Sequence, residues 1–281
     1  MQFRHSINAL RAVAVIIVVF FHFRIPGFWG GYIGVDIFFV ISGFLMTGII
    51  LTGSEQDRFS LLTFYVSRAR RIVPALLGLC LALGLFGFLY LPADDYRSLL
   101  RDISSSLLFA SNFSLVKSGD YFAAAPHENW LLHSWSLSLE WQFYLLYPLL
   151  LMGIRRYYGA SRDLTATVIL ALALLSLLAS ALVTPAFPAF AFYLLPTRAW
   201  ELLIGGLLFL YPFTPSPAVR HLLEAAGLAA ITLGLILLDE QAPWPGILAL
   251  IPVAGAALVI LANSDSPISR NPLLQSIGSI S

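Results

Sequence analysis

Eight apolar runs, each about as long as a bilayer is thick, constrain the fold of this chain more than any other feature. They cover residues 7–23, 33–51, 72–91, 131–152, 164–183, 193–211, 222–238 and 247–262. An α-helix of roughly 20 apolar residues crosses the hydrocarbon core, where the backbone must satisfy its own hydrogen bonds. The sequence therefore predicts an all-α polytopic transmembrane bundle of eight spans, and residues 272–281 read as the start of a ninth.

The composition agrees with a protein whose main partner is the lipid bilayer. The chain is 59% hydrophobic and 11% charged, with a mean hydropathy of +0.84, which lies outside the range of soluble domains. A net charge of +1 says nothing about nucleic acid, but the sequence contains no Lys/Arg tract of the kind that binds nucleic acid, so no such partner is expected. Cys80 is the only cysteine, so neither a disulfide framework nor a thiolate metal site is expected. No internal repeat is visible, which favours one membrane domain over residues 1–281, and the oligomeric state cannot be read from the sequence.

Basic residues predict the orientation, because cytoplasmic loops carry an excess of Lys and Arg. With a cytoplasmic N-terminus, ten basic residues fall on the inner side: Arg4, Arg58, Arg68, Arg70, Arg71, Arg155, Arg156, Arg162, Arg220 and Arg270. Four fall on the outer side: Arg24, Arg97, Arg101 and Lys117. We therefore expect a cytoplasmic N-terminus. Part of the long outer connection, residues 96–113, has the pattern of a surface helix.

The first expected span carries two side chains that lipid does not tolerate, Arg11 and His22. Eleven residues of α-helix rise about 16 Å and leave the two side chains within about 20° of each other around the axis. A guanidinium at the bilayer centre costs about 2.5–3.5 kcal/mol on insertion scales, which favours a face that looks into the bundle or a wet cavity. Alternatively, Arg11 extends to the near headgroups and His22 lies at the far interface. This segment alone leaves both interpretations open.

The second expected span places Asp36 near the outer end of an otherwise aromatic and aliphatic helix. An acid near His22 would hold the imidazole in one tautomer and raise its basicity, so we expect Asp36 to orient His22. The alternative is an acid in the headgroup zone, on a face used for packing. Ser42 and Gly43 follow on the same helix, and small residues there let another backbone approach closely.

Three arginines lie at the inner end of the third expected span. Arg68 and Arg71 are three residues apart and share a helix face, with Arg70 between them. Planar guanidinium groups can clamp a phosphate or pyrophosphate. Ordinary positive-inside anchoring also explains basic residues at such a site, and for these arginines taken alone it is the better explanation.

Polar side chains also occur in the fourth and sixth expected spans. His133 and Glu140 are seven residues apart, which places them within about 20° on one helix face. An intramembrane Glu is a candidate functional residue, unless it pairs with an Arg from another span. Arg198 and Glu201 can pair with each other at a spacing of three, which is the simpler structural interpretation.

Taken together, these motifs resemble the acyltransferase 3 family of membrane acyltransferases. The residues that carry the resemblance are Arg11 with His22, segment 34–44 (GVDIFFVISGF), Arg68 with Arg71, segment 135–144 (WSLSLEWQFY), and Arg198 with Glu201. Each is weak alone, but the set in this order is specific. The tail 271–281 (NPLLQSIGSIS) resembles members fused to an SGNH hydrolase-like domain, in which the membrane domain continues. We therefore expect this chain to correspond to the N-terminal part of such a protein, truncated at its C-terminus.

The resemblance implies transfer of an acyl group, usually acetyl from acetyl-CoA, to a hydroxyl of an extracytoplasmic glycan. O-antigen of lipopolysaccharide, peptidoglycan and exopolysaccharide are the acceptors of such enzymes, which lie in the bacterial cytoplasmic (inner) membrane. It also implies that Arg11 and His22 are the catalytic pair and that Arg68 and Arg71 belong to a donor-binding motif. Acetyl-CoA is then the co-substrate, and no metal is expected.

The remaining polar residues take expected roles beside these. We assign Asp36 and Glu140 to the catalytic group, Arg70 to the donor site, and three residues to acceptor binding: His133, Arg198 and Glu201. His22 would act as the base, and Arg11 would steer the donor or stabilise the oxyanion. Direct attack by the sugar and a transient acyl-enzyme both remain open.

The competing class of function is a proton-coupled transporter or flippase of a glycan or small metabolite, in which the buried charges form a path. The sequence shows neither a repeat nor paired broken helices in matching halves, and both features are typical of transporters.

Overall fold

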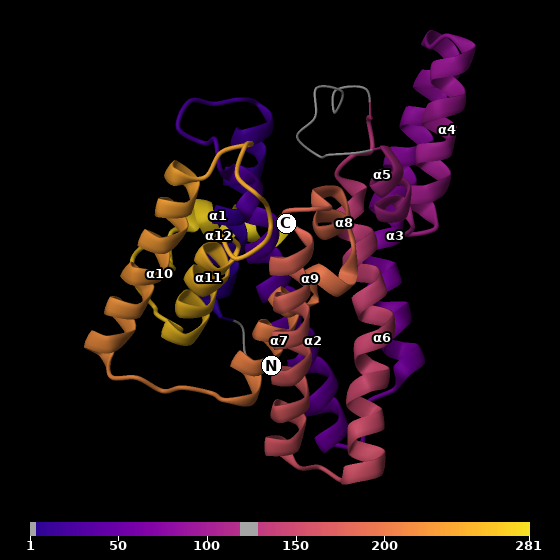
Figure 1. The fold of residues 1–281 in the computed structure, drawn as a ribbon. Coiled ribbons are helices and arrows are strands. Elements are labelled where there is room, and N and C mark those ends of the chain that lie inside the picture. The colour runs from indigo at the N-terminus through magenta and orange to yellow at the C-terminus, as the bar shows by residue number, and fades with distance from the viewer. Residues whose placement is uncertain (1–3, 119–128) are drawn as a thin grey trace.

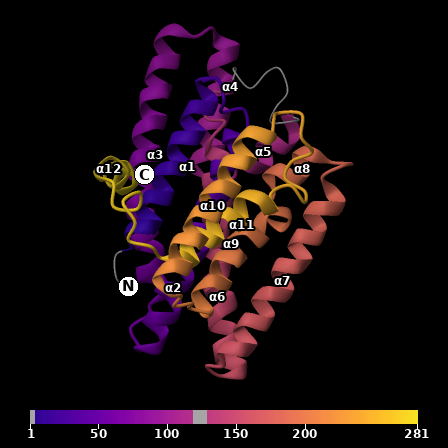
Figure 2. The same cartoon turned by 90° about the vertical axis from the view of Figure 1, so that its left-hand side faces the viewer.

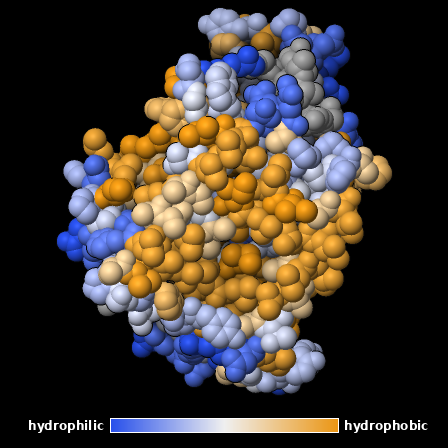
Figure 3. Space-filling view, turned by 60° about the vertical axis from the view of Figure 1, so that its left-hand side comes forward, coloured by the Kyte–Doolittle hydropathy of each residue, from blue (hydrophilic) through white to orange (hydrophobic). Residues whose placement is uncertain are grey.

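The computed structural model describes residues 4–118 and 129–281, and within these ranges it contains helices and no strand. The predicted all-α membrane bundle is confirmed (Figure 1). Seven helical segments are long and apolar enough to cross a membrane: His5–His22, Gly31–Glu55, Leu61–Tyr90, Ser134–Tyr158, Arg162–Val183, Pro188–Leu210 and Pro217–Leu237. On the face shown in Figure 3, a broad hydrophobic region lies between hydrophilic residues at the two ends of the molecule.

The helices run alternately toward and away from the end of the bundle at which α1 stops, which we call the His22 end. In the first half of the chain they are α1 (His5–His22), η1 (Gly31–Ile33), α2 (Gly34–Glu55), α3 (Leu61–Tyr90), α4 (Ala93–Leu107) and α5 (Ser111–Ser118). In the second half they are α6 (Ser134–Tyr158), α7 (Arg162–Val183), α8 (Pro188–Tyr193), α9 (Leu195–Leu210), α10 (Pro217–Leu237), α11 (Leu250–Ala262) and α12 (Pro272–Ile280).

Two of the expected spans differ from the helices that the structure contains. The eighth, α11, has 13 residues and rises about 19 Å, less than the hydrocarbon core. By length, the described residues therefore contain seven full spans rather than eight. The sixth, expected over residues 193–211, corresponds to α9, and the short helix α8 precedes it with Leu194 extended between them. Pro196 lies in the first turn of α9, where its missing N–H costs no helical hydrogen bond, so it is compatible with a helix that starts there.

Two other boundaries matter for the site. Helix α3 begins at Leu61 rather than at residue 72, and the Ser60 side chain caps it by accepting a hydrogen bond from the Thr63 N–H at 3.4 Å. The basic motif at Arg68 therefore lies inside a helix. The expected surface helix 96–113 is instead two helices, α4 and α5, with the described part of that connection ending at Ser118.

Helix α2 lies at the centre of the bundle, where it packs against α1, α6, α9 and α11 (Figure 2). Its contact with α9 depends on glycine. A Cβ at Gly43 would overlap the carbonyl oxygen of Leu202, and a Cβ at Gly205 would overlap that of Val40. The predicted close approach at Gly43 is thus confirmed, and the two backbones touch without side chains between them. Helix α12 packs against α1, where Asn8 donates a hydrogen bond to the Gln275 carbonyl at 2.8 Å.

Candidate active site

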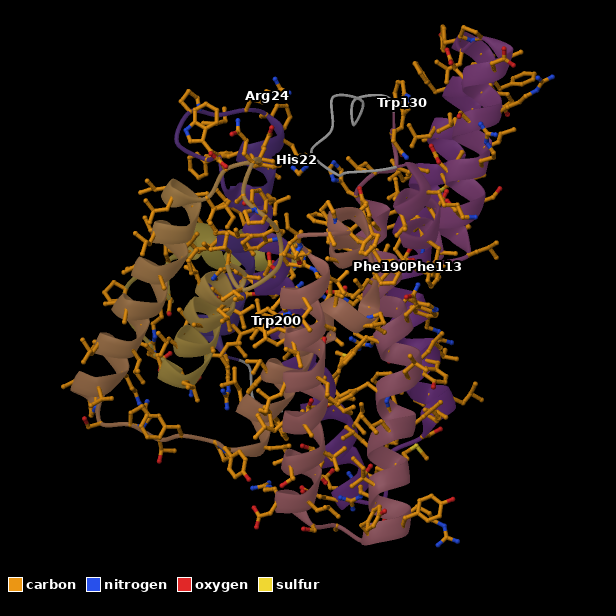
Figure 4. The ribbon with its side chains drawn as sticks, in the orientation of Figure 1. His22, Arg24, Phe113, Trp130, Phe190 and Trp200 are labelled. Carbon is orange, nitrogen blue, oxygen red and sulfur yellow. The ribbon has the colours of Figure 1, made fainter. Side chains whose placement is uncertain are left out.

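Helix α1 presents its two unusual polar residues at different depths. Arg11 is half-buried within the helix, whereas His22 is its last residue and is exposed. Figure 4 shows His22 near Arg24 at the same end of the molecule. The interval of about 16 Å along the axis separates two groups of polar side chains, one around each residue. Both groups are built between α1 and α6.

The upper group is a pair of histidines. The imidazole rings of His22 on α1 and His133, which caps the N-terminus of α6, meet edge to face with centroids 4.2 Å apart. The Nδ1 atom of His22 lies 2.7 Å from the carbonyl oxygen of Val18, one helical turn earlier. A carbonyl only accepts, so Nδ1 carries the proton in the neutral ring and Nε2 carries the lone pair. The backbone therefore sets the tautomer in which Nε2 can act as a base.

His133 stays uncharged in this arrangement. Partial burial of the ring, followed by the charge of the neighbouring His22, lowers the pKa of His133 to about 4. Above that pH it adds no positive charge beside His22. The expectation that Asp36 orients His22 is not met, since the recorded partner of Nδ1 is the Val18 carbonyl. His133, which we expected at the acceptor end, is the residue that the structure brings against the His22 ring.

The lower group is centred on Glu140 of α6. Ser42 donates a hydrogen bond to Oε1 of Glu140 at 2.9 Å, and the hydroxyl of Tyr144 donates to Oε2 at 3.0 Å. Ser42 also lies 3.2 Å from the Tyr144 hydroxyl oxygen. Both oxygens of the carboxylate are therefore held by hydroxyl groups. This geometry fixes Glu140 at the junction of α2 and α6.

Three arginines lie around the pair of Glu140 and Tyr144. Arg11 lies within electrostatic range of Glu140, Tyr144 and Arg71, and Arg68 of α3 lies within range of Tyr144 and Arg71. The group thus joins four helices, α1, α2, α3 and α6. It holds more positive than negative charge, because it contains one carboxylate and three guanidinium groups. That balance suits an anionic ligand.

Arg70 is not part of the lower group. It is exposed, and as the next residue before Arg71 it points about 100° away around the helix. Arg71 also reaches the last residue of the chain, where its Nη2 donates a hydrogen bond to the Ser281 backbone oxygen at 3.3 Å. Of the three arginines assigned to the donor, only Arg68 and Arg71 therefore share a face that meets Glu140.

Asp36, Arg198 and Glu201 form a separate buried cluster. The Nη1 atom of Arg198 lies 2.9 Å from Asp36 and 2.8 Å from Glu201, and the side chains are between 0% and 1% exposed. Aromatic rings of Phe39, Trp135 and Phe192 surround the guanidinium. The simpler interpretation of Arg198 and Glu201 as an i, i+3 pair is observed, with Asp36 added from α2. Contact with a substrate would require α2 and α9 to separate.

The sequence does not single out two members of the lower group, Tyr144 and Ser42. Tyr144 follows Glu140 by four residues, so helical spacing alone could have marked the two as neighbours. Ser42 was assigned to packing, and no pattern in the sequence links it to a glutamate 98 positions away.

Comparison with known proteins identifies relatives of this chain. The chain matches a family model described as an acyltransferase domain, acyltransferase 3, over residues 4–281. A Haemophilus influenzae protein named only as uncharacterized is 34% identical over 246 residues, which cover 83% of this chain and 99% of that protein. No solved structure matches the chain.

Two further relatives carry functional names. The peptidoglycan O-acetyltransferase OatA of Listeria monocytogenes is 32% identical over 277 residues, covering 94% of this chain and 44% of that protein. A Staphylococcus aureus protein named as an O-acetyltransferase is 29% identical over 259 residues, covering 87% of this chain and 42% of that protein. The chain thus spans less than half the length of these two relatives. The family match over almost all its residues shows that this chain belongs to the acyltransferase 3 family.

Proposed function

We propose that this protein transfers an acetyl group from cytoplasmic acetyl-CoA to a hydroxyl of an extracytoplasmic glycan. Peptidoglycan is the first acceptor to test, because one relative is named a peptidoglycan O-acetyltransferase. O-antigen and exopolysaccharide are the other acceptors with the same chemistry. The observation that carries the proposal is the placement of two polar groups at two depths on one face of α1: Arg11 with Glu140, and His22 with His133.

The lower group binds the acetyl donor. Arg11, Arg68 and Arg71 offer guanidinium groups to the phosphates of acetyl-CoA, and Glu140 holds them in place through its charge. Arg11 lies six residues from the start of α1, about 9 Å from that end of the helix. A cytoplasmic N-terminus makes this group accessible to a cytoplasmic anion. The exposed Arg70 then anchors the helix at the membrane surface.

The upper group serves the acceptor. His22 Nε2 removes the proton from a sugar hydroxyl, and the oxygen attacks the thioester carbonyl carbon. The C–S bond breaks, the thiolate of CoA leaves, and the proton on His22 returns to that sulfur. Arg11 lies about 16 Å from His22 along the helix, so it steers the donor and does not contact the same carbonyl. The pantetheine arm of acetyl-CoA bridges this interval along α1.

The proposed cellular location rests on the same orientation, with a cytoplasmic N-terminus. The named relatives are bacterial proteins, and a multi-pass protein that uses cytoplasmic acetyl-CoA and an external glycan belongs in the cytoplasmic membrane. The His22 end then faces outward.

Reconstituted vesicles test the proposal. Acetyl-CoA with a labelled acetyl group is supplied on the face opposite the His22 end, with soluble peptidoglycan fragments on the His22 side. We expect label on the glycan, and we expect His22→Ala to abolish it. His221→Ala is the matched control, because His221 lies at the start of α10, at the other end of the bundle.

Two results would contradict the proposal. If a His22→Ala variant that melts like the wild type still transfers acetyl groups, His22 is not the catalytic base. Movement of glycan across the membrane without dependence on acetyl-CoA would instead indicate the transporter alternative.

A further inference from the structure

A cavity of about 460 Å³ lies at the His22 end, between the loop that follows α1 and the end of α10. The loop contributes aromatic rings and one guanidinium, and the segment after α10 contributes two carboxylates and an amide. Its polar lining residues and the aromatic residues of the loop are Arg24, Phe28, Trp29, Asp239, Glu240 and Gln241, and apolar side chains of α1, the loop and the end of α10 complete the lining. All of the named residues are exposed except Phe28, which is half-buried, so the cavity opens outward.

The two walls of the cavity are tied together by hydrogen bonds. The Gly30 N–H donates to the Leu235 carbonyl at 3.1 Å, and the Tyr32 hydroxyl donates to the Asp239 carbonyl at 3.0 Å. A side chain at Gly30 would meet the Gly234 carbonyl oxygen 2.7 Å away, so only glycine allows this approach. The Gln241 N–H donates to the Asp239 carboxylate at 3.0 Å, which fixes the turn. The site is therefore formed before any ligand arrives.

The chemistry of the lining suits a polyhydroxylated ligand. A flat indole offers an apolar face to the C–H side of a sugar ring, and carboxylate and amide oxygens accept hydrogen bonds from hydroxyl groups. Trp29 is 54% exposed, so its ring is accessible for stacking. The carboxylates of Asp239 and Glu240 outnumber the single guanidinium of Arg24, so the lining disfavours a phosphate-bearing donor. Charge therefore separates this cavity from the arginine-rich lower group.

The cavity adjoins the proposed base. Phe21, the residue before His22, lines it, and Glu240 is close enough for its charge to act on the His22 imidazole. We propose that this cavity is the acceptor subsite, where a carbohydrate stacks on Trp29 and bonds to Glu240 with a hydroxyl directed at His22. This inference rests on the proposed function. Trp29 and Glu240 are then glycan-binding residues that the motifs of the family resemblance do not include.

Direct binding separates this inference from the transfer reaction. A short oligosaccharide of N-acetylglucosamine is titrated onto the His22→Ala protein in detergent, without donor, and the dissociation constant is measured. We expect Trp29→Ala and Glu240→Gln each to weaken binding about tenfold. Trp29→Phe keeps an aromatic face and should retain most of the affinity. Tyr90→Ala is the matched control, since Tyr90 is 72% exposed at the same end and does not line the cavity.

The outcomes distinguish the two proposals. Equal affinity of Trp29→Ala, Glu240→Gln and the parent protein, all melting alike, would overturn the acceptor subsite while leaving the role of His22 intact. Weakened binding in these variants, together with a wild-type protein that transfers no acetyl group from acetyl-CoA, would support the subsite and contradict the proposed function. In an active enzyme, the same variants should raise the KM for glycan and leave the KM for acetyl-CoA unchanged.

Discussion

At the scale of single residues, His133 links the protonation of the site to the stability of the protein. Its pKa is lowered to about 4 by partial burial and by His22, whereas an unfolded histidine titrates near 6.5. Between those values the unfolded chain binds more protons than the folded one, so folding is destabilised as pH falls from about 6.5 to about 4. Above about pH 6.5 the effect is absent.

We therefore expect His133→Gln to flatten the pH dependence of the melting temperature. Detergent-solubilised wild type and variant should differ least above pH 6.5 and progressively more toward pH 4, with the wild type losing more stability. Melting curves recorded across this range check the prediction. Parallel curves for the two proteins would show that His133 does not titrate as the structure implies.

Residue patterns predicted part of the site. Helical spacing placed Arg11 and His22 on one face, as it did His133 and Glu140, because that geometry is local. Helical spacing could not show that His133 contacts His22 or that Asp36 pairs with Arg198. Those contacts join residues 111 and 162 positions apart, and only the packing of the helices decides them. Asp36 is paired with the Nη1 atom of the buried Arg198 guanidinium, which explains why the acid is not available to His22.

At the scale of elements, glycine positions decide how closely α2 and α9 pack. We expect Gly205→Ala to destabilise the protein by about 1–3 kcal/mol, because the new Cβ would overlap the Val40 carbonyl oxygen. Gly153→Ala in α6 is the matched control, since a Cβ there meets no atom within 4 Å. Unfolding free energies in mixed micelles provide the measurement. Equal stability of the two variants would show that α2 and α9 do not touch at this point.

Hydropathy located the spans but not their ends. An apolar run marks the part of a helix inside lipid, whereas α3 begins at Leu61 because Ser60 caps it and α9 begins after the break at Leu194. Neither the capping serine nor the break at Leu194 changes the mean hydropathy of the surrounding residues. Length is also misleading at α11, because the apolar run begins at residue 247 whereas residues 247–249 form a turn and the helix begins at Leu250. Apolar residues in a turn lengthen an apolar run without lengthening the helix.

At the scale of the whole molecule, the proposed function requires one orientation. Arg4, Arg58 and Arg156 lie at the end opposite His22, and the positive-inside rule assigns that end to the cytoplasm. In this orientation the lower group around Arg11 is nearer the compartment that holds acetyl-CoA, the donor in the proposed function. The cavity beside Trp29 opens toward the compartment that holds the glycan.

Single cysteines test this orientation in intact cells. Cys80, the only cysteine, is buried in α3 and is replaced by serine. We expect a membrane-impermeant maleimide to label Arg97→Cys on α4, where the native side chain is 75% exposed, and to label Arg156→Cys only after permeabilisation. The reverse pattern would place His22 and its cavity in the cytoplasm. An external glycan would then never reach the proposed base, so the orientation and the acceptor assignment would fail together.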